Sequence, residues 1–169
     1  TTGLDHIDKK FCDRNNIKIL SLNNVKKKIK NIYSTADLTI GLMISLVRKI
    51  NFSNKYVVKH KKFERYKFIS RDLSNLTVGI IGYGRLGKRV SKYTSSLGMK
   101  NLIYNIKNKN FSIKKLISKS DIIIITASSY DGRKILNKEH IQKLKKNSYI
   151  INTSRFFSVD EDEVIKKLK

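Results

Sequence analysis

The chain has 169 residues, enough for one domain with a sizeable core, and its 40% hydrophobic residues exclude a disordered chain. A formal net charge of +24 is typical of proteins that bind nucleic acid or an anionic membrane. However, the basic residues are mostly Lys spread along the chain, together with many Asn and Ile and no Pro, which we interpret as a codon-composition bias toward A and T. We therefore expect no specific nucleic-acid partner and no membrane partner.

Cys12 is the only cysteine, so the chain has no disulfide framework and no cysteine-based metal site. We expect no metal site at all. The longest apolar stretch, Leu38 to Val47, is too short to span a bilayer. The chain starts at Thr1 inside a turn pattern and stops at Lys169 inside a helical pattern, so we expect it to be an internal fragment of a longer protein.

The first half of the chain predicts a turn, then a helix through about Asn15, a short strand at Ile17–Leu20 and a polar connection up to Asn31. Apolar residues then recur at helical spacing from Ser34 to Ile50. The segment 51–75 is irregular, basic and aromatic. Such a segment indicates either a surface loop or subunit contact, or a surface on which nucleic-acid bases stack.

From Thr77 on, strands alternate with helices. Apolar runs predict strands at Thr77–Ile81, Asn101–Tyr104, Asp121–Ile125 and Tyr149–Asn152. Helical patterns lie at about Arg85–Leu97, Ile113–Lys119, Lys138–Leu144 and Glu161–Lys169. Continuous apolar runs are typical of parallel strands covered by helices on both faces. The pattern therefore predicts an α/β fold with a doubly wound parallel sheet of the Rossmann type.

The first of these strands leads into G-Y-G-R-L-G at Gly82–Gly87, a G-x-G-x-x-G motif between a strand and a helix. Gly82 permits a tight turn, Gly84 permits close approach of a pyrophosphate, and Gly87 permits the helix to lie against the strand. The helix N-terminus attracts phosphate. The motif predicts a dinucleotide site, and the alternative is an ordinary tight turn.

Residues that follow parallel strands share one edge of the sheet, where ligands bind. Here they are Gly82, Asn105, Thr126 and the run Thr153-Ser154-Arg155. Arg155 is the only strong charge among them. Position alone leaves two interpretations, a clamp for an anionic substrate and a solvated surface arginine.

Further motifs extend the pattern to nearly the whole chain. They are T-G-L-D-H-I-D at Thr2–Asp8, S-T-A-D-L-T at Ser34–Thr39, S-D-I-I-I-I at Ser120–Ile125, I-N-T-S-R at Ile151–Arg155 and V-D-E-D-E-V-I at Val159–Ile165. With these motifs in this order, the chain resembles the NAD-dependent D-isomer-specific 2-hydroxyacid dehydrogenases, a family that includes D-3-phosphoglycerate dehydrogenase. The resemblance implies that residues 1–33 end a flavodoxin-like substrate domain. Residues 34–169 would be a Rossmann cofactor domain, truncated at its C-terminal end.

The resemblance also implies site residues. Thr2 and Gly3 would hold the substrate carboxylate, and Arg155 would be the catalytic arginine that binds this carboxylate and polarises the carbonyl. The residues expected around the cofactor are Gly82, Gly84, Arg85, Leu86, Gly87, Asn105, Thr126, Ala127, Thr153 and Ser154. The family further implies NAD as cofactor, a 2-hydroxy or 2-oxo acid as substrate, a homodimer and a cytoplasmic location.

Four departures from the family pattern stand beside this likeness. The catalytic Glu and His of the family would lie beyond Lys169, so the chain alone is expected to be inactive, and its own three histidines match no catalytic position. Phe156 and Phe157 replace glycines and would be strained at a positive φ. Thr126-Ala127-Ser128 stands where the family has His-x-Pro. Asn105 replaces an acidic residue, which predicts that NADP is tolerated beside NAD. The alternative to an oxidoreductase is a degenerate cofactor-binding module that acts as a sensor or structural subunit.

Overall fold

The computed structural model describes residues 3–22, 28–105, 112–127 and 134–168. The chain divides into two compact units, 1–32 and 33–169. In the first unit, the Asp8 carboxylate accepts the Phe11 N–H at 3.0 Å and caps helix α1 (Lys9–Arg14). A 3-10 turn, η2 (Lys28–Asn31), ends the unit. The strand predicted at residues 17–20 is wrong, because this segment has no strand partner among the described residues.

The second unit is built on four parallel strands, β1 (Thr77–Ile81), β2 (Lys100–Tyr104), β3 (Ile122–Ile125) and β4 (Tyr149–Asn152). Their order in the sheet is β2-β1-β3-β4, so the chain runs outward from β1 on one side and then returns to its other side. The predicted parallel α/β sheet is therefore confirmed, with strand bounds that differ from the prediction by at most one residue.

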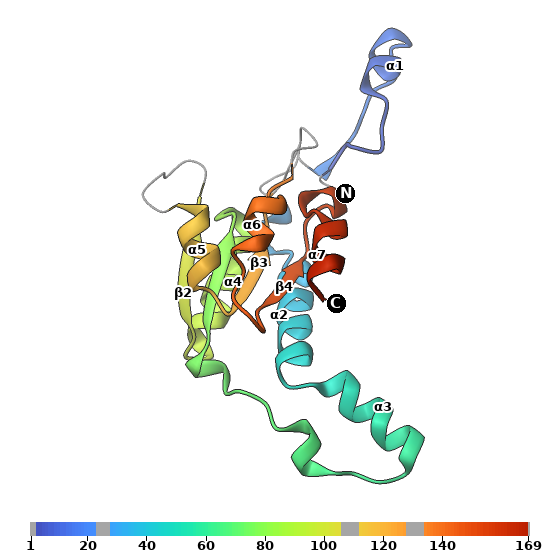
Figure 1. Ribbon diagram of the computed structural model, residues 1–169. Helices are drawn as coiled ribbons and strands as arrows, with labels where there is room; N and C mark the ends of the chain where they lie inside the picture. The colour runs from blue at the N-terminus through green and yellow to red at the C-terminus, as the bar shows by residue number, and fades with distance from the viewer. Residues whose placement is uncertain (1–2, 23–27, 106–111, 128–133, 169) are drawn as a thin grey trace. The chain divides into compact units, whose positions relative to one another are not determined.

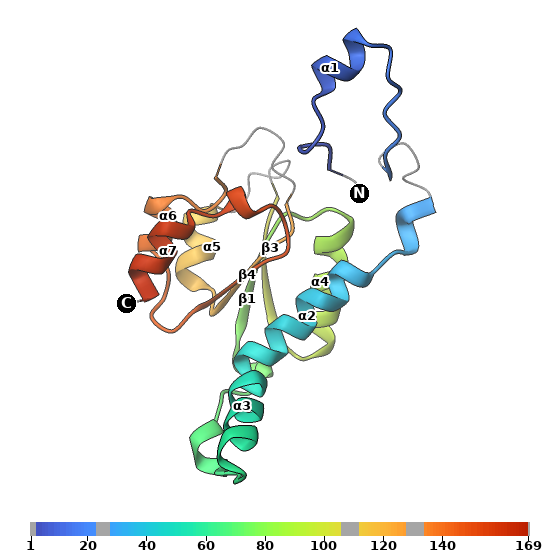
Figure 2. The same cartoon turned by 90° about the vertical axis from the view of Figure 1, so that its right-hand side faces the viewer.

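Helices cover both faces of this sheet (Figures 1 and 2). On one face, α2 (Ser34–Val47) and α4 (Arg85–Ser96) pack against Val78, Ile80 and Ile124. On the other face, α5 (Ile113–Lys119) and α6 (Lys138–Gln142) pack against Ile123 and Ile125. Alternate residues of one strand thus enter two separate cores, which explains why the strands are apolar without alternation.

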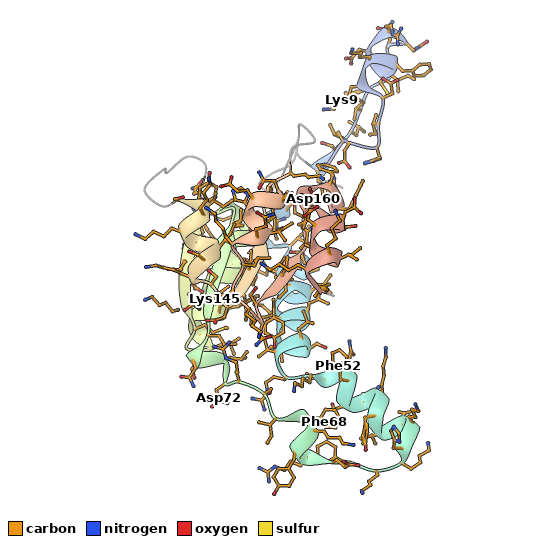
Figure 3. All side chains as sticks on the ribbon, viewed as in Figure 1. Lys9, Phe52, Phe68, Asp72, Lys145 and Asp160 are labelled. Atoms are coloured by element: carbon orange, nitrogen blue, oxygen red, sulfur yellow. The ribbon has the colours of Figure 1, made fainter. Side chains whose placement is uncertain are left out.

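Asp121 ties the sheet together at the end where β1 and β3 begin. Its carboxylate accepts the Thr77 N–H at 2.9 Å, the Arg71 guanidinium at 3.3 Å and the Lys145 ammonium at 3.2 Å (Figure 3 labels Lys145). Burial alone would raise the pKa of this carboxyl, but the Thr77 hydrogen bond and the two cations lower the pKa below its ordinary value.

The region between α2 and β1 differs from the prediction. The helix expected to reach Ile50 ends at Val47, and Lys49 has a φ of 55°. A second helix, α3 (Ile50–His60), follows it in a segment that was predicted to be irregular. Short 3-10 turns η3 (Arg65–Phe68) and η4 (Leu73–Asn75) then lead to β1. The sequence pattern missed α3 because this helix buries no residue and so has no apolar period.

Side chains of α3 and η3 pack against each other and form the segment we call the arm, residues 50–68 (Figure 3 labels Phe52 and Phe68). Tyr56 donates a hydrogen bond to Glu64, and the Lys67 ammonium lies 2.9 Å from both side chains. The bonds from Tyr56 and Lys67 lower the pKa of Glu64. The Tyr56 ring also contacts Phe68, with ring centroids 5.5 Å apart.

The C-terminal part contains the 3-10 turn η5 (Phe156–Ser158) and helix α7 (Glu161–Leu168). Asp160 caps α7, because its carboxylate accepts the Glu163 N–H. The Lys134 ammonium also contacts this carboxylate at 2.8 Å. No helix in the described part of the chain is long and apolar enough to cross a membrane.

Candidate cofactor-binding site

The strand order places a topological switch point at the carboxyl ends of β1 and β3. After β1 the chain moves to β2 on one side, and β3 then pairs with the other side of β1. Gly82 follows β1 and Thr126 follows β3, so both residues lie at the point where the direction of winding reverses. Ligands of doubly wound sheets bind at this point.

Gly82 begins the loop with a φ of +100°, a conformation that side chains rarely adopt. A Cβ on Gly82 would lie 2.6 Å from the Ala127 nitrogen, so the loops after β1 and β3 are in direct contact. The Gly82 N–H donates to the Tyr104 carbonyl at 2.9 Å, which ties the same loop to the end of β2. A residue with a side chain would separate these three strand ends.

Gly84 and Gly87 have different surroundings. A Cβ on Gly87 would lie 1.9 Å from the Gly82 carbonyl oxygen, so this glycine lets α4 lie against the loop. At Gly84, the N-cap of α4, a Cβ would meet nothing within 4 Å, and no side chain caps the helix. This open space adjoins the N-terminus of α4, and helix N-termini bind phosphate groups, so the loop is compatible with the dinucleotide predicted from the motif. Arg85 and Leu86 are the first two residues of that helix.

The loops after β3 and β4 are hydrogen-bonded to this loop and to each other. The Thr126 hydroxyl donates to the Gly82 carbonyl at 2.8 Å, and the Ser154 hydroxyl donates to the Ala127 carbonyl. The Thr153 hydroxyl lies 2.9 Å from the hydroxyl of Thr39, a fully buried residue of α2. The sequence-predicted residues from three strand ends therefore form one connected group.

Arg155 follows this group, half-buried, with extended backbone dihedrals (φ −88°, ψ 147°). The strain expected at Phe156 and Phe157 is absent, because neither residue has a positive φ. Both begin the turn η5, which any residue can adopt, and their rings form an edge-to-face pair with centroids 5.3 Å apart.

Three further residues predicted from the sequence lie outside the loops after β1, β3 and β4 or outside the described residues. Asn105 directly follows β2 at the same edge of the sheet as Gly82. Gly3 belongs to the first unit, and Thr2 lies outside the described residues. Sequence reasoning overlooked Thr39 and Asn152, two polar residues that contact the Thr153–Arg155 turn. A threonine inside the apolar pattern of α2 and an asparagine at the end of a buried strand were the available signals.

Metal-binding clusters and two of the three histidines were the other candidates for chemistry in the described residues. They contain no group of three or more His, Cys, Asp or Glu side chains that could hold a metal ion. The His60 ring packs at a tilt against the Tyr56 ring, with ring centroids 4.3 Å apart. His140 forms a reciprocal cap with Asn137 at the start of α6, and burial lowers the pKa of its imidazole. Both histidines therefore have structural contacts.

Comparison with known proteins gives concordant matches. Residues 40–169 match the family described as D-isomer specific 2-hydroxyacid dehydrogenase, NAD binding domain. An aromatic 2-oxoacid reductase from Clostridium sporogenes is 36% identical over 146 residues, covering 80% of this chain and 44% of the relative. A glyoxylate reductase from Thermofilum pendens is 29% identical over 187 residues, covering the whole chain and 53% of the relative.

A solved structure adds support for the fold. It is the D-lactate dehydrogenase of Aquifex aeolicus in complex with NAD and lactic acid, with a TM-score of 0.84 and 28% identity. The match covers 99% of this chain and 52% of that structure. The chain thus spans about half the length of the relatives it matches. Taken together, the matched family, the parallel sheet and the glycine loop show that this chain belongs to the D-isomer-specific 2-hydroxyacid dehydrogenases, with residues 40–169 matching their NAD-binding domain.

Proposed function

We propose that the protein is an NAD-dependent oxidoreductase that acts on the CH–OH group of a D-2-hydroxy acid. The observation that carries this proposal is that the glycine loop, with open space at Gly84, is hydrogen-bonded through Thr126 to the loop after β3. That loop is in turn hydrogen-bonded to Ser154, the residue before Arg155. Names of the relatives reported above, all reductases or dehydrogenases, support the same reaction class. None of them supports the alternative of a sensor or structural subunit.

In this proposal the chain binds and orients both reactants. The loop Gly82–Gly87 holds the cofactor pyrophosphate, Thr126 and Ala127 line the adenosine side, and Thr153 and Ser154 approach the nicotinamide. NAD, when bound, supplies or accepts the hydride. Arg155 binds the substrate carboxylate and polarises the carbonyl. A planar, permanently charged guanidinium is better suited to this task than an ammonium group.

The role of Arg155 is tested by NADH-dependent reduction of glyoxylate, pyruvate and hydroxypyruvate with the complete natural protein. We expect Arg155→Ala to lower kcat/KM about 100-fold or more, roughly 2.7 kcal/mol of transition-state stabilisation. Arg155→Lys should recover part of this loss, because it restores the charge without the fork. The matched control Arg48→Ala removes an exposed arginine paired with Asp72 at 3.7 Å and should leave kcat/KM unchanged. Equal activity of Arg155→Ala and wild type would refute the role.

Cofactor choice is the finer part of this proposal. An acidic residue at the end of β2 would bind the ribose hydroxyls and repel the additional phosphate of NADP. Asn105 lies at that place without a charge. We therefore expect NADP to bind within about 100-fold of NAD, a difference below roughly 2.7 kcal/mol, in calorimetric titrations with both cofactors. Asn105→Asp should widen the gap by weakening NADP alone. If the wild type binds NAD more than about 100-fold more tightly than NADP, Asn105 does not determine the cofactor preference.

We also infer a homodimer. Helix α2 exposes Leu38, Leu42 and Leu46 at intervals of four residues, which align them on one face. Phe52 and Val58 of the arm are 65% and 61% exposed. A second copy that covers these apolar side chains removes them from water. In sedimentation experiments, Leu42→Asp should shift the protein to monomer, whereas Leu168→Asp, at an exposed leucine of α7, should not.

A further inference from the structure

Asn152, the last residue of β4, makes two hydrogen bonds to the turn that follows it. Its Oδ1 accepts the Ser154 N–H at 3.0 Å, and its Nδ2 donates to the Arg155 carbonyl at 2.9 Å. A backbone N–H can only donate and a carbonyl can only accept, so the two partners determine which way the amide faces. The single side chain therefore spans the turn and reaches the backbone of Arg155.

The same turn is anchored to β3. The Thr153 N–H donates to the Ile125 carbonyl at 3.3 Å, and the Ser154 hydroxyl donates to the Ala127 carbonyl. After the turn, the Arg155 carbonyl accepts a second hydrogen bond, from the Ser158 N–H at 3.0 Å. The backbone of Arg155 is thus fixed from both sides, with the Asn152 amide as the side-chain support that contacts it directly.

We propose that Asn152 is a positioning residue for Arg155, an inference that rests on the proposed function of Arg155. A guanidinium on a long, flexible side chain reaches a productive place only if its Cα is held within a fraction of an ångström. An amide of this length both donates and accepts, whereas a carboxylate of the same shape only accepts. Asn152→Asp keeps the bond to Ser154 but sets a carboxylate against the Arg155 carbonyl.

The test is steady-state kinetics of Asn152→Asp in the complete natural protein, with glyoxylate, pyruvate and hydroxypyruvate as substrates. We expect kcat/KM for the 2-oxo acid to fall about tenfold or more, while the Kd for NADH changes less than about twofold. Asn152→Ala removes both bonds without adding a charge that could pair with Arg155. It should likewise lower kcat/KM while leaving the Kd for NADH nearly unchanged. The matched control is Asn137→Asp. The Asn137 side chain accepts the His140 N–H at 3.0 Å, so a carboxylate replaces it without loss.

A double-mutant cycle distinguishes positioning from a merely structural role. If Asn152 acts through Arg155, Asn152→Ala should cause no further loss of kcat/KM in an Arg155→Ala background. Equal losses in both backgrounds would overturn the positioning role, as would unchanged kinetics of Asn152→Asp and Asn152→Ala while Arg155→Ala is impaired. If Arg155→Ala is itself as active as the wild type, or the wild type reduces none of the acids, the proposed function of Arg155 fails and the positioning role with it.

Discussion

At the scale of single residues, two glycines of one motif serve opposite needs. At Gly87 a methyl group would collide with the Gly82 carbonyl, so this glycine is required by the fold. At Gly84 a methyl group would enter open space, at a φ of −82° that an alanine adopts without strain. Gly84 is therefore the position at which a ligand requirement can be separated from a folding requirement.

We expect Gly84→Ala to fold as stably as the wild type while the Kd for NADH rises about tenfold or more, because the methyl group occupies the space proposed for the pyrophosphate. Gly41→Ala is the matched control. It also places a Cβ in open space, but within α2, and should leave the Kd unchanged and raise stability by about 0.5–1 kcal/mol. Isothermal titration with NADH and thermal unfolding measure both quantities. An unchanged Kd for NADH in Gly84→Ala would contradict the proposal that the pyrophosphate occupies the space at Gly84.

Asp121 makes the free energy of unfolding depend on pH in the acidic range. Its folded pKa is lower than its unfolded pKa, so its contribution is complete above the ordinary value of 3.8 and is lost as pH falls through the folded pKa. We expect Asp121→Asn to destabilise the fold by about 1–2 kcal/mol at neutral pH, with a difference from wild type that narrows below about pH 4. Urea titrations across pH measure this. Asp72→Asn, which loses only an exposed pair with Arg48, should change stability by less than about 0.5 kcal/mol at neutral pH.

At the scale of elements, the break between α2 and α3 depends on the backbone of one residue. Lys49 has a φ of 55° and a ψ of 32°, a left-handed conformation that costs a side-chain-bearing residue about 1 kcal/mol. Glycine adopts this conformation without that cost. The arm begins directly after this residue, so the break sets the direction in which the arm leaves α2.

We therefore expect Lys49→Gly to raise the thermal unfolding temperature, with a gain of about 0.5–1 kcal/mol. The same change at Lys55, in the interior of α3, should instead lower helix content and cost about 0.5–1 kcal/mol. Circular dichroism during thermal unfolding compares the two variants, which remove identical side chains. A loss of stability in both would mean that the left-handed conformation of Lys49 is not strained.

At the scale of the whole molecule, the net charge of +24 creates an attraction for polyanions that carries no sequence information. We expect DNA and RNA of unrelated sequences to bind alike, and the affinity to fall by orders of magnitude between about 50 and 200 mM salt. Fluorescence anisotropy with several labelled oligonucleotides measures this. A sequence preference that persists at physiological salt would contradict the interpretation of the charge as compositional bias.

Much of the fold was predictable because it depends on local patterns. Four apolar runs and one glycine motif predicted the strands, their parallel arrangement and the edge at which Gly82, Thr126 and Arg155 follow them. The prediction succeeded because strands buried on both faces need continuous apolar residues, and parallel strands end at a common edge. The strand order, with β1 between β2 and β3, could be seen only in the structure.

What the sequence by itself determined is thus the class of fold and the family, and it predicted a set of residues around the cofactor site. Only the tertiary structure decided that Gly84 faces open space and Gly87 does not, that Phe156 is unstrained, and that Asn152 holds the backbone of Arg155. These properties depend on distances between groups and on the backbone dihedrals that the surrounding contacts impose. Apolar periodicity indicates only which residues are buried, so it predicts neither these distances nor these dihedrals. For the same reason it does not predict a helix such as α3, which buries no residue.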